Sequence, residues 1–519
     1  MKKIILTLSL SGLITIVFAQ QNPTAVKYAA VISPELAKKH LSIIASDAYE
    51  GRETGKPGAD KAAHYIADEF KTLGLQPIVN GSYFLKVPIV THVLKTSFSV
   101  NSQVFLHRAD FYAGRADVDK SLSTSDIVFV GYGTEGEIGN TDLTGKILLW
   151  INEDKPVTGK STDTALRGNP ARGAVSKNLR SKNPAVILAV SGAANDLLKR
   201  IKGNTPSVGM TIKKDNSTLA NQTDGFFWVT TQLADQLLKS SGKTYRELKA
   251  ACANGVIPAQ TVKADVKLNY YTEYKDVKAV DVLGFLPGSD PKLKDEVLVI
   301  SAHYDHIGLE PEGTKGDRVN NGADDDGSGT TGIMEIARAF SKAKKDSYGP
   351  RRSILFLGNV GEEKGLLGSE YYTDHPVIPL ANTIADINID MIGRIGDEYK
   401  GKADSANYVY VVGSGMLSTD LHNADEKANK TYTNLVLDYK FDDPKDPNDI
   451  YRRSDHYNFA KHGVPIIFYY NGEHPDYHGV GDEVSKINFP LLAKRAQLAF
   501  YTAWDLVNAD NRPVVDGKK

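Results

Sequence analysis

The stretch Glu296-Val-Leu-Val-Ile-Ser301 is a nearly unbroken apolar run, and the segment Ala302-His303-Tyr304-Asp305-His306 follows it directly. An apolar run without alternation is typical of a strand buried on both faces of a sheet. Further runs of this kind occupy residues 280–286, 353–358, 383–389, 408–412 and 465–470. Helical patterns lie between them at residues 332–343, 456–462 and 490–506. This alternation predicts an α/β/α domain of three layers around a mostly parallel, mixed sheet.

The rest of the chain divides into two parts. Residues 33–75 have the pattern of two helices, the first beginning with Ser33 as N-cap and Pro34 at the first helical position. Residues 83–90 and 97–106 are predicted strands. From about residue 112 to 272 the sequence pattern differs. Short apolar segments, predicted to be strands, are separated by polar stretches that contain glycine, and this part has few histidines and no cluster of carboxylates that suggests a catalytic site. We therefore expect the three-layer domain to be built from residues 20–111 and 273–519, with residues 112–272 inserted as a smaller α+β domain.

Composition narrows the class of protein. The 519 residues include 62 basic and 63 acidic side chains, so overall charge gives no attraction to nucleic acid. Cys252 is the only cysteine, which rules out an intrachain disulfide and makes cysteine catalysis a poor hypothesis.

The first residues have the pattern of a cleavable signal peptide. Lys2 and Lys3 precede an apolar run over residues 4–18, and Val17-Phe18-Ala19 resembles a cleavage site. The run is short for a spanning helix. We expect residues 1–19 to be removed, leaving an exported protein, periplasmic or secreted, without a stable membrane anchor.

Polar clusters follow several of the predicted strands. They are His303-Tyr-Asp305-His306, Asn321-Gly-Ala-Asp324-Asp325-Asp326-Gly-Ser-Gly329, Glu362-Glu363, Asp390 and Tyr477-His478. Each alone has an ordinary explanation: a surface histidine, a helix cap such as Ser328, or solvated glutamates. Together they would place two imidazoles and at least three carboxylates at one edge of the sheet, where a pair of divalent cations would neutralise them.

These motifs resemble the M28 type of co-catalytic zinc aminopeptidases. The resemblance covers residues 20 to about 106 and 275 to about 508, and the inserted block resembles a protease-associated domain. It implies a three-layer zinc-peptidase fold holding two Zn²⁺. It also implies Asp324 as the carboxylate that bridges both ions, with a cis peptide between Asp324 and Asp325. The other implied ligands are His303 and Asp390 at one ion, and Glu363 and His478 at the second.

The resemblance also assigns two catalytic roles. Glu362 would be the general base that takes a proton from the attacking water. Asp305, two residues beyond His303 on the same predicted strand, would orient that imidazole. His306, His462 and His474 are given no metal role, and Ser454 is interpreted as a helix N-cap.

The predicted function is hydrolysis of the N-terminal residue from peptide substrates. A carboxypeptidase or dipeptidase of the same fold remains the nearest alternative, since Arg318, Arg394, Arg452 and Arg453 could bind a free carboxylate. A glutaminyl cyclase-like transferase with one zinc, and an inactive relative acting as a receptor, are further alternatives.

Overall fold

The computed structural model describes residues 21–114, 116, 119–156, 170–201, 208–213 and 225–517. The predicted signal peptide at residues 1–19 lies outside this part of the chain. The chain forms two compact units, the first made of Met1–Pro88 and Lys278–Lys519 and the second of Ile89–Val277.

Among the described residues, the first unit has an eight-stranded sheet in the order β1-β11-β15-β12-β16-β19-β17-β18. Its strands are β1 Phe84–Lys86, β11 Val280–Leu286, β12 Val297–His303, β15 Ser353–Asn359, β16 Thr383–Ile389, β17 Tyr408–Val412, β18 Val436–Asp438 and β19 Ile466–Tyr470. The four central strands β15, β12, β16 and β19 are parallel, and β1, β11 and β17 add antiparallel pairs. The sheet is therefore mixed with a parallel centre, as predicted.

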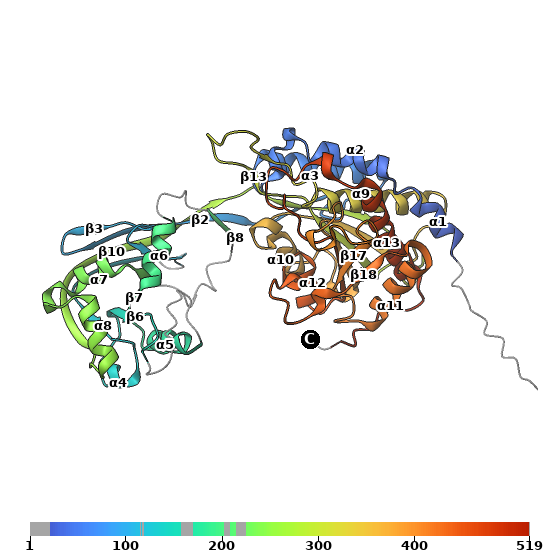
Figure 1. Ribbon diagram of the computed structural model, residues 1–519. Helices are drawn as coiled ribbons and strands as arrows, with labels where there is room; N and C mark the ends of the chain where they lie inside the picture. Colours follow the sequence, from blue (N-terminus) through green and yellow to red (C-terminus); the bar gives the residue numbers. More distant parts are fainter. Residues whose placement is uncertain are drawn as a thin grey trace, which may run out of the picture. The chain divides into compact units, whose positions relative to one another are not determined.

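Helices cover both faces of this sheet (Figure 1). One layer contains α1 Pro23–Ala29, α2 Pro34–Ile44, α3 Pro57–Leu73, α9 Gly327–Lys345 and α13 Phe489–Asn508, which pack on one another. The opposite layer contains α10 Leu367–Asp374 and α12 His456–Lys461, while α11 Thr419–Ala428 packs beside α13. The predicted three-layer fold is confirmed.

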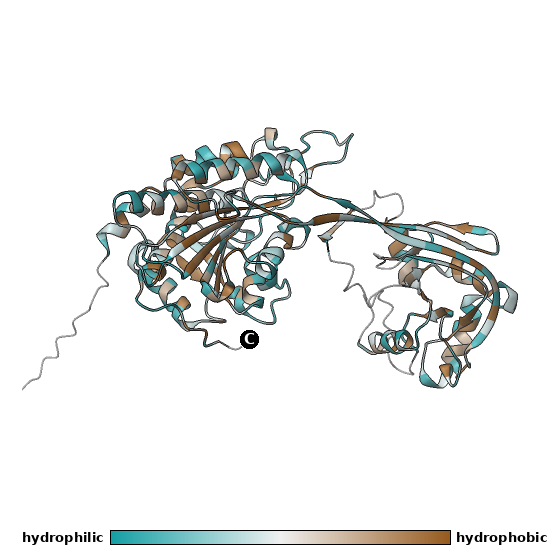
Figure 2. Ribbon diagram, turned by 180° about the vertical axis from the view of Figure 1, so that it is seen from behind, coloured by the Kyte–Doolittle hydropathy of each residue, from teal (hydrophilic) through white to brown (hydrophobic). Residues whose placement is uncertain are grey.

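The apolar runs explain why the sheet is central. Every residue of β12, β15 and β16 is buried. Figure 2 shows the strands of this unit as the most hydrophobic part of the ribbon, with hydrophilic residues along the outer helices. Because the central strands are parallel, the polar segments that follow them meet at the same edge of the sheet.

Local signals also fix the helix ends. Ser33 accepts a hydrogen bond from the backbone N–H of Leu36 and caps α2, as predicted. Gly74 ends α3 in the left-handed region, at φ 83°. The cap of α9 is Asp326, which accepts from the N–H of Gly329, whereas Ser328 lies inside the helix.

The second unit has a sheet of its own in the order β3-β2-β10-β5-β6-β7-β9-β4, with β8 beside β2. Its strands are β2 Ile89–Val100, β3 Gln103–Phe105, β4 Phe111–Tyr112, β5 Lys120–Phe129, β6 Ile147–Ile151, β7 Val186–Val190, β8 Gly209–Ile212, β9 Phe226–Val229 and β10 Gln260–Asp276. Helices α7 Thr231–Leu238 and α8 Tyr245–Asn254 pack against each other, and Cys252 is fully buried in this unit's core.

This unit begins earlier than the predicted boundary at residue 112. The cause is β2, which pairs with β10 from Val90↔Asp276 to Val100↔Val266 and so belongs to the same sheet. Local sequence patterns identify a strand near residue 97 but not its partner about 170 residues later.

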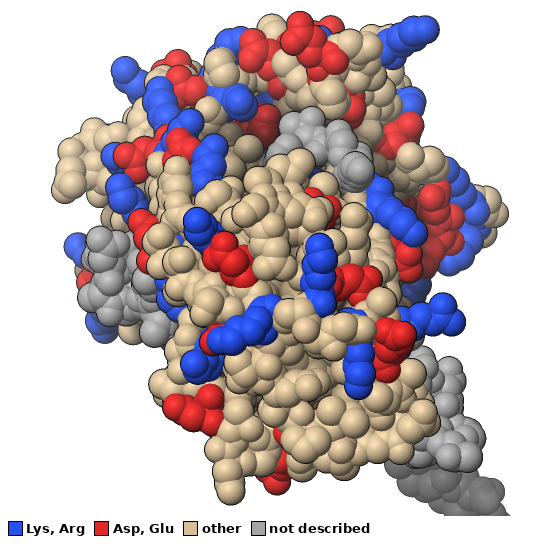
Figure 3. Space-filling view, turned by 90° about the vertical axis from the view of Figure 1, so that its left-hand side faces the viewer, with Lys and Arg blue, Asp and Glu red and all other residues tan. Residues whose placement is uncertain are grey.

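On the face shown in Figure 3, basic and acidic side chains are interspersed. Within the described ranges, none of the helices combines the length and apolar character needed to cross a bilayer.

One buried carboxyl group predicts a pH-dependent stability. Asp425 of α11 is fully buried and accepts hydrogen bonds from the hydroxyls of Tyr469 (2.5 Å) and Thr502 (3.0 Å). Burial raises the pKa of Asp425 to about 6. The folded chain therefore keeps a proton that the unfolded chain has released above pH about 4, so this group's contribution to stability is lost as pH rises toward 6 and beyond.

The Asp425→Asn variant has no carboxyl group to ionise at this position, so its stability should not fall for this reason as pH rises. Relative to wild type, the variant's free energy of unfolding should rise by up to about 3 kcal/mol between pH 4 and 7. Urea unfolding at several pH values measures it, with the exposed Asp420→Asn on the same helix as control. Parallel curves for wild type and Asp425→Asn would contradict the prediction.

Candidate metal centre

Loops at the carboxyl ends of the parallel strands bring the predicted side chains together. His303 is the last residue of β12, Glu362 and Glu363 begin the turn after β15, and Asp390 follows β16 directly. The Nε2 atom of His303 lies 3.6 Å from Asp390 Oδ1 and 3.9 Å from Glu362 Oε2. These are separations at which ligand atoms can share one ion.

The carboxylate of Asp325 lies between two imidazoles, that of His303 and that of His478. Its Oδ1 lies 3.3 Å from Nε2 of His303, and its Oδ2 lies 3.1 Å from Nε2 of His478. Each oxygen therefore faces a different imidazole, which is the arrangement a bridging carboxylate requires. His478 Nε2 is also 3.2 Å from Glu363 Oε2, which completes the second half.

Asp324 does not occupy this place, and the prediction for it is wrong by one residue. Its Oδ1 accepts hydrogen bonds from the N–H of Gly393 (2.7 Å) and the hydroxyl of Ser328 (3.0 Å). Its Oδ2 lies 3.3 Å from Nε2 of His474. These partners hold Asp324 on the other side of the loop. The cis peptide lies between Asp325 and Asp326, also one residue later than expected.

The third aspartate ties the loop to its surroundings. One oxygen of Asp326 accepts from the N–H of Gly329 (2.8 Å) and of Met391 (3.1 Å), and the other accepts from the N–H of His303 (3.2 Å). From the opposite side, Asp482 accepts from the N–H groups at positions 324 and 325. The loop is thus bound to β12, α9, the end of β16 and the segment after His478.

Two groups of side chains in the described ranges bring potential ligand atoms within 4.8 Å of one another: His303 with Glu362 and Asp390, and His306 with Asp325 and Glu363. Glu362 is thus part of the first group, close enough to His303 and Asp390 to act as a base there. His306 was given no metal role by the sequence, yet it is part of the second group.

The charges of the site call for a cation. Burial raises the pKa of Glu362 well above its ordinary value, which the nearby His303 opposes and Glu363 and Asp390 reinforce. Burial alone would lower the pKa of His478, but the carboxylates of Asp325 and Glu363 raise it to about 10. The carboxylates thus draw protons onto the imidazoles, and a divalent ion would supply that positive charge instead.

Unpaired polar atoms point to the same conclusion. Within the described part of the chain, Asp325 Oδ2, Glu363 Oε1 and both ring nitrogens of His306 are buried without an aligned hydrogen-bond partner. Buried polar atoms normally have partners. Mixed imidazole and carboxylate donors fit Zn²⁺, so these residues fit the predicted metal.

Asp305 supports the site differently from the prediction. Asp305 lies beyond the end of β12. The Nδ1 atom of His303 is 3.1 Å from the backbone oxygen of Asp305 and 3.8 Å from the Asp305 carboxylate. The carboxylate accepts from the hydroxyl of Thr54 (2.5 Å) and from the N–H of Glu362 (3.3 Å). Asp305 therefore positions the base as well as the imidazole.

Arg52 is a supporting residue that sequence patterns did not reveal. It is 1% exposed and donates hydrogen bonds only to backbone oxygens in its recorded contacts. The acceptors are the carbonyls of Tyr304 (2.8 Å), Ile44 (3.0 Å), Asn321 (2.6 Å), Gly322 (2.8 Å) and Asp325 (3.5 Å). The segment before α3 is thus attached to both loops that supply the metal-site residues.

Ser454 also contacts the site rather than capping a helix. Its hydroxyl donates to Asp390 Oδ2 (2.6 Å) and accepts from the side-chain amide of Asn388 (2.8 Å). The residue at the N-cap position of α12 is Asp455, which makes no capping hydrogen bond. The interpretation of Ser454 as an N-cap is therefore corrected: it fixes the orientation of Asp390.

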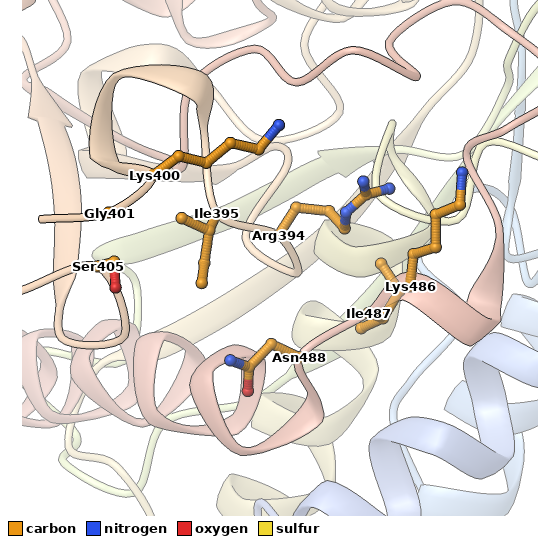
Figure 4. Close-up of a pocket in the computed structure, with 8 residues that line it drawn as sticks. All are labelled: Arg394, Ile395, Lys400, Gly401, Ser405, Lys486, Ile487 and Asn488. Carbon is orange, nitrogen blue, oxygen red and sulfur yellow. The ribbon is translucent and has the colours of Figure 1, made fainter.

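The arginines that could bind a substrate carboxylate already have acceptors. Arg394 lines a cavity of about 400 Å³ with Lys400, Lys486 and Asn488 (Figure 4), and its guanidinium donates to Asp476 at 2.8 Å. The remaining pairs are Arg318 with the Glu310 carbonyl, Arg452 with Asp449, and Arg453 with Glu473.

Comparison with known proteins adds independent information. Residues 281–503 match the model of Peptidase family M28. Leucine aminopeptidase 2 of Trichophyton equinum is 27% identical over 250 residues, 44% of this chain and 44% of that protein. Aminopeptidase YwaD of Bacillus subtilis (strain 168) is 24% identical over 272 residues, 50% of this chain and 51% of that protein. The chain thus spans about half the length of these relatives.

One solved structure shares the fold across most of the chain. The aminopeptidase from Aneurinibacillus sp. strain AM-1 matches with a TM-score of 0.53 at 18% identity, covering 95% of this chain and 98% of that one. All the clustered side chains, from His303 to His478, lie inside the segment that the family model matches. Residues 281–503 of this chain are therefore similar to peptidase family M28, and the fold is shared with a solved aminopeptidase structure.

Proposed function

We propose that this chain is an exported dinuclear zinc aminopeptidase that releases N-terminal residues from peptides. The observation that supports this best is Asp325, whose two carboxylate oxygens face His303 and His478 in two adjoining sets of ligand atoms. The relatives of known name are aminopeptidases. We further propose that the second unit is a protease-associated module.

The proposed ligands divide between two ions. His303 and Asp390 would hold one, Glu363 and His478 the other, and Asp325 would bridge them. Two zinc ions in these positions would lower the pKa of a water molecule and polarise the scissile carbonyl.

Glu362 is the proposed general base. Its carboxylate lies beside His303 and Asp390, and its backbone N–H is held by Asp305. It would take a proton from the attacking water and return it to the nitrogen of the leaving amine. A general base must keep its carboxylate free to take a proton, so Glu362 is not counted among the proposed metal ligands.

Electrostatics favours an aminopeptidase over a carboxypeptidase. A free α-ammonium group would meet carboxylates at this site, whereas a free carboxylate would need an unpaired cation. The four arginines considered for that role all have acceptors among their neighbours. The full set of proposed ligands and the base also argues against an inactive relative.

The test is hydrolysis of leucyl-p-nitroanilide by the zinc-loaded protein, compared with its N-acetylated form and with a C-terminally amidated peptide. An aminopeptidase should cleave the first and third but not the second. Cleavage that requires a free C-terminus would overturn the proposal in favour of a carboxypeptidase. Zinc content of the active protein should be about two ions per chain.

The assignment of Asp325 makes a sharper prediction about metal content. Asp325→Asn should reduce bound zinc below two ions per chain, because the amide lacks the second anionic oxygen needed to bridge. Asp324→Asn is the matched control, since its carboxylate contacts Gly393, Ser328 and His474 instead. Metal analysis after gel filtration measures both variants, and zinc loss in Asp324→Asn alone would reverse the assignment.

Export is proposed from the first residues alone. The pair Lys2 and Lys3, the apolar run and the small residue Ala19 support a signal peptide cleaved before Gln20. N-terminal sequencing of the protein recovered from the periplasm or medium should begin at Gln20. An uncleaved N-terminus in the cell interior would contradict this.

A further inference from the structure

His306 is a buried imidazole at the centre that neither the motifs nor the proposed ligand set uses. It is 0% exposed, and its backbone N–H donates to the carbonyl of Arg52 at 3.1 Å. A parallel β-bridge joins it to Glu53. Gly322 lies so close that a Cβ there would be 2.5 Å from His306 Cγ. The ring is therefore confined by its surroundings.

The ring faces the second set of ligand atoms. Its Nδ1 lies 2.8 Å from Glu363 Oε1 and 3.6 Å from Asp325 Oδ2. The ring of His478 is inclined to it by 68°, with centroids 5.8 Å apart. In the described structure neither ring nitrogen has an aligned hydrogen-bond partner. The carboxylates of Glu363 and Asp325 are therefore the groups close to this buried imidazole that can offset its desolvation.

These distances fit a shared ion. His478 Nε2 is 3.1 Å from Asp325 Oδ2 and 3.2 Å from Glu363 Oε2. Four ligand atoms about 2.1 Å from a tetrahedral zinc ion are about 3.4 Å from one another. The ligand atoms of His306, Asp325 and Glu363 lie within 4.8 Å of one another, at separations of 2.8 Å and 3.6 Å from His306 Nδ1, and His478 approaches the other oxygen of Glu363.

We propose that His306 is a further ligand of the ion held by Glu363, His478 and the bridging Asp325. This inference rests on the proposed dinuclear site. It makes the two ions unequal: the second has two nitrogen and two oxygen donors, whereas the first has one imidazole, that of His303. The richer imidazole set should bind zinc more tightly.

A different role would leave similar coordinates. His306 could donate a hydrogen bond to Glu363 and only position that ligand. The two roles differ in what they do to the metal: a positioning partner typically changes metal affinity 10–100-fold, whereas a ligand also changes the number of imidazoles bound to zinc.

X-ray absorption of the full chain loaded with two zinc ions tests the proposal directly. With His303, His306 and His478 all bound, the fit should give about 1.5 imidazoles per zinc ion, and without His306 about 1.0. A value near 1.0 in the wild-type protein would overturn the proposal. Failure to bind zinc at all would overturn the dinuclear site itself, so the two failures are distinguishable.

Variants extend the test to affinity. His306→Gln should weaken one of the two zinc sites by more than about 100-fold in chelator competition, beyond the range of a positioning partner, and should lower the imidazole count to that of two histidines. His474→Gln is the control, because that buried ring faces Asp324 rather than the ion. His306→Cys, which restores a ligand atom, should recover affinity. Weakened affinity with an unchanged imidazole count would assign His306 a positioning role and overturn the proposal.

Discussion

Glu362→Gln is expected to lower kcat by about 10²–10⁴-fold while leaving zinc content unchanged. The amide has the shape of the carboxylate but cannot take a proton from the attacking water. The backbone contact to Asp305 does not involve the altered group, so the turn that holds residue 362 should keep its position. The measurement is kcat on leucyl-p-nitroanilide together with metal analysis of the same sample.

Two controls separate a base from a ligand. Glu370→Gln on α10 changes a carboxylate outside both sets of ligand atoms and should keep wild-type kcat and zinc. Loss of a zinc ion in Glu362→Gln would make Glu362 a ligand, which its place beside His303 and Asp390 would allow. Near wild-type kcat would contradict the assigned role altogether.

Arg52→Met should lower the free energy of unfolding by about 3–5 kcal/mol, because several buried carbonyl oxygens lose their donor at about 1–3 kcal/mol each. Methionine keeps much of the volume but leaves the carbonyls of Tyr304, Asn321 and Gly322 without their donor. Buried acceptors that lose their partner each cost free energy. The loop before Asp325 should also lose its alignment, so metal affinity should fall together with stability.

Urea unfolding of the metal-free protein measures the change in the free energy of unfolding without the contribution of bound zinc. Arg452→Met is the matched control, since that side chain is 57% exposed and pairs only with Asp449 in its own turn among the recorded ion pairs. Its effect should stay within about 1 kcal/mol. Equal effects of the two substitutions would show that Arg52 contributes no more than a surface arginine.

The sequence was sufficient for most of the first unit because its signals are local. Runs such as residues 296–301 and 383–389 are apolar throughout, and the structure buries every residue of the strands they form. Ser33 and Gly74 mark helix ends through their own backbone chemistry. The edge at which the polar clusters meet then follows from parallel strand order.

The structure brings the predicted His303, Glu362, Glu363, Asp390 and His478 together, but the aspartate between the two imidazoles is one residue later than predicted, for a physical reason. Three consecutive aspartates offer three chemically identical candidates, and only their different partners distinguish them. Asp324 is held by Gly393 and Ser328, Asp326 by Gly329 and Met391, and Asp325 is left facing the imidazoles. None of those partners is visible in the local pattern.

Contacts between the site and residues far away in the sequence could not be predicted from local patterns for the same reason. Arg52 lies in a glycine-rich polar loop of the kind that is usually solvated, but the structure buries it under loops about 250 residues later. Ser454 has the appearance of a helix cap and instead binds Asp390. The pairing of β2 with β10, which moves the boundary of the second unit, is equally non-local.

The split of the first unit has a consequence for when activity arises. Arg52 and Thr54 come from the segment that precedes the second unit, and the last proposed ligand, His478, lies near the far end of the chain. A ribosome must therefore complete the whole intervening unit, and nearly all that follows, before the proposed metal centre can assemble. Under the proposed function, nascent or prematurely terminated chains would lack His478 and would be inert toward the peptides around them.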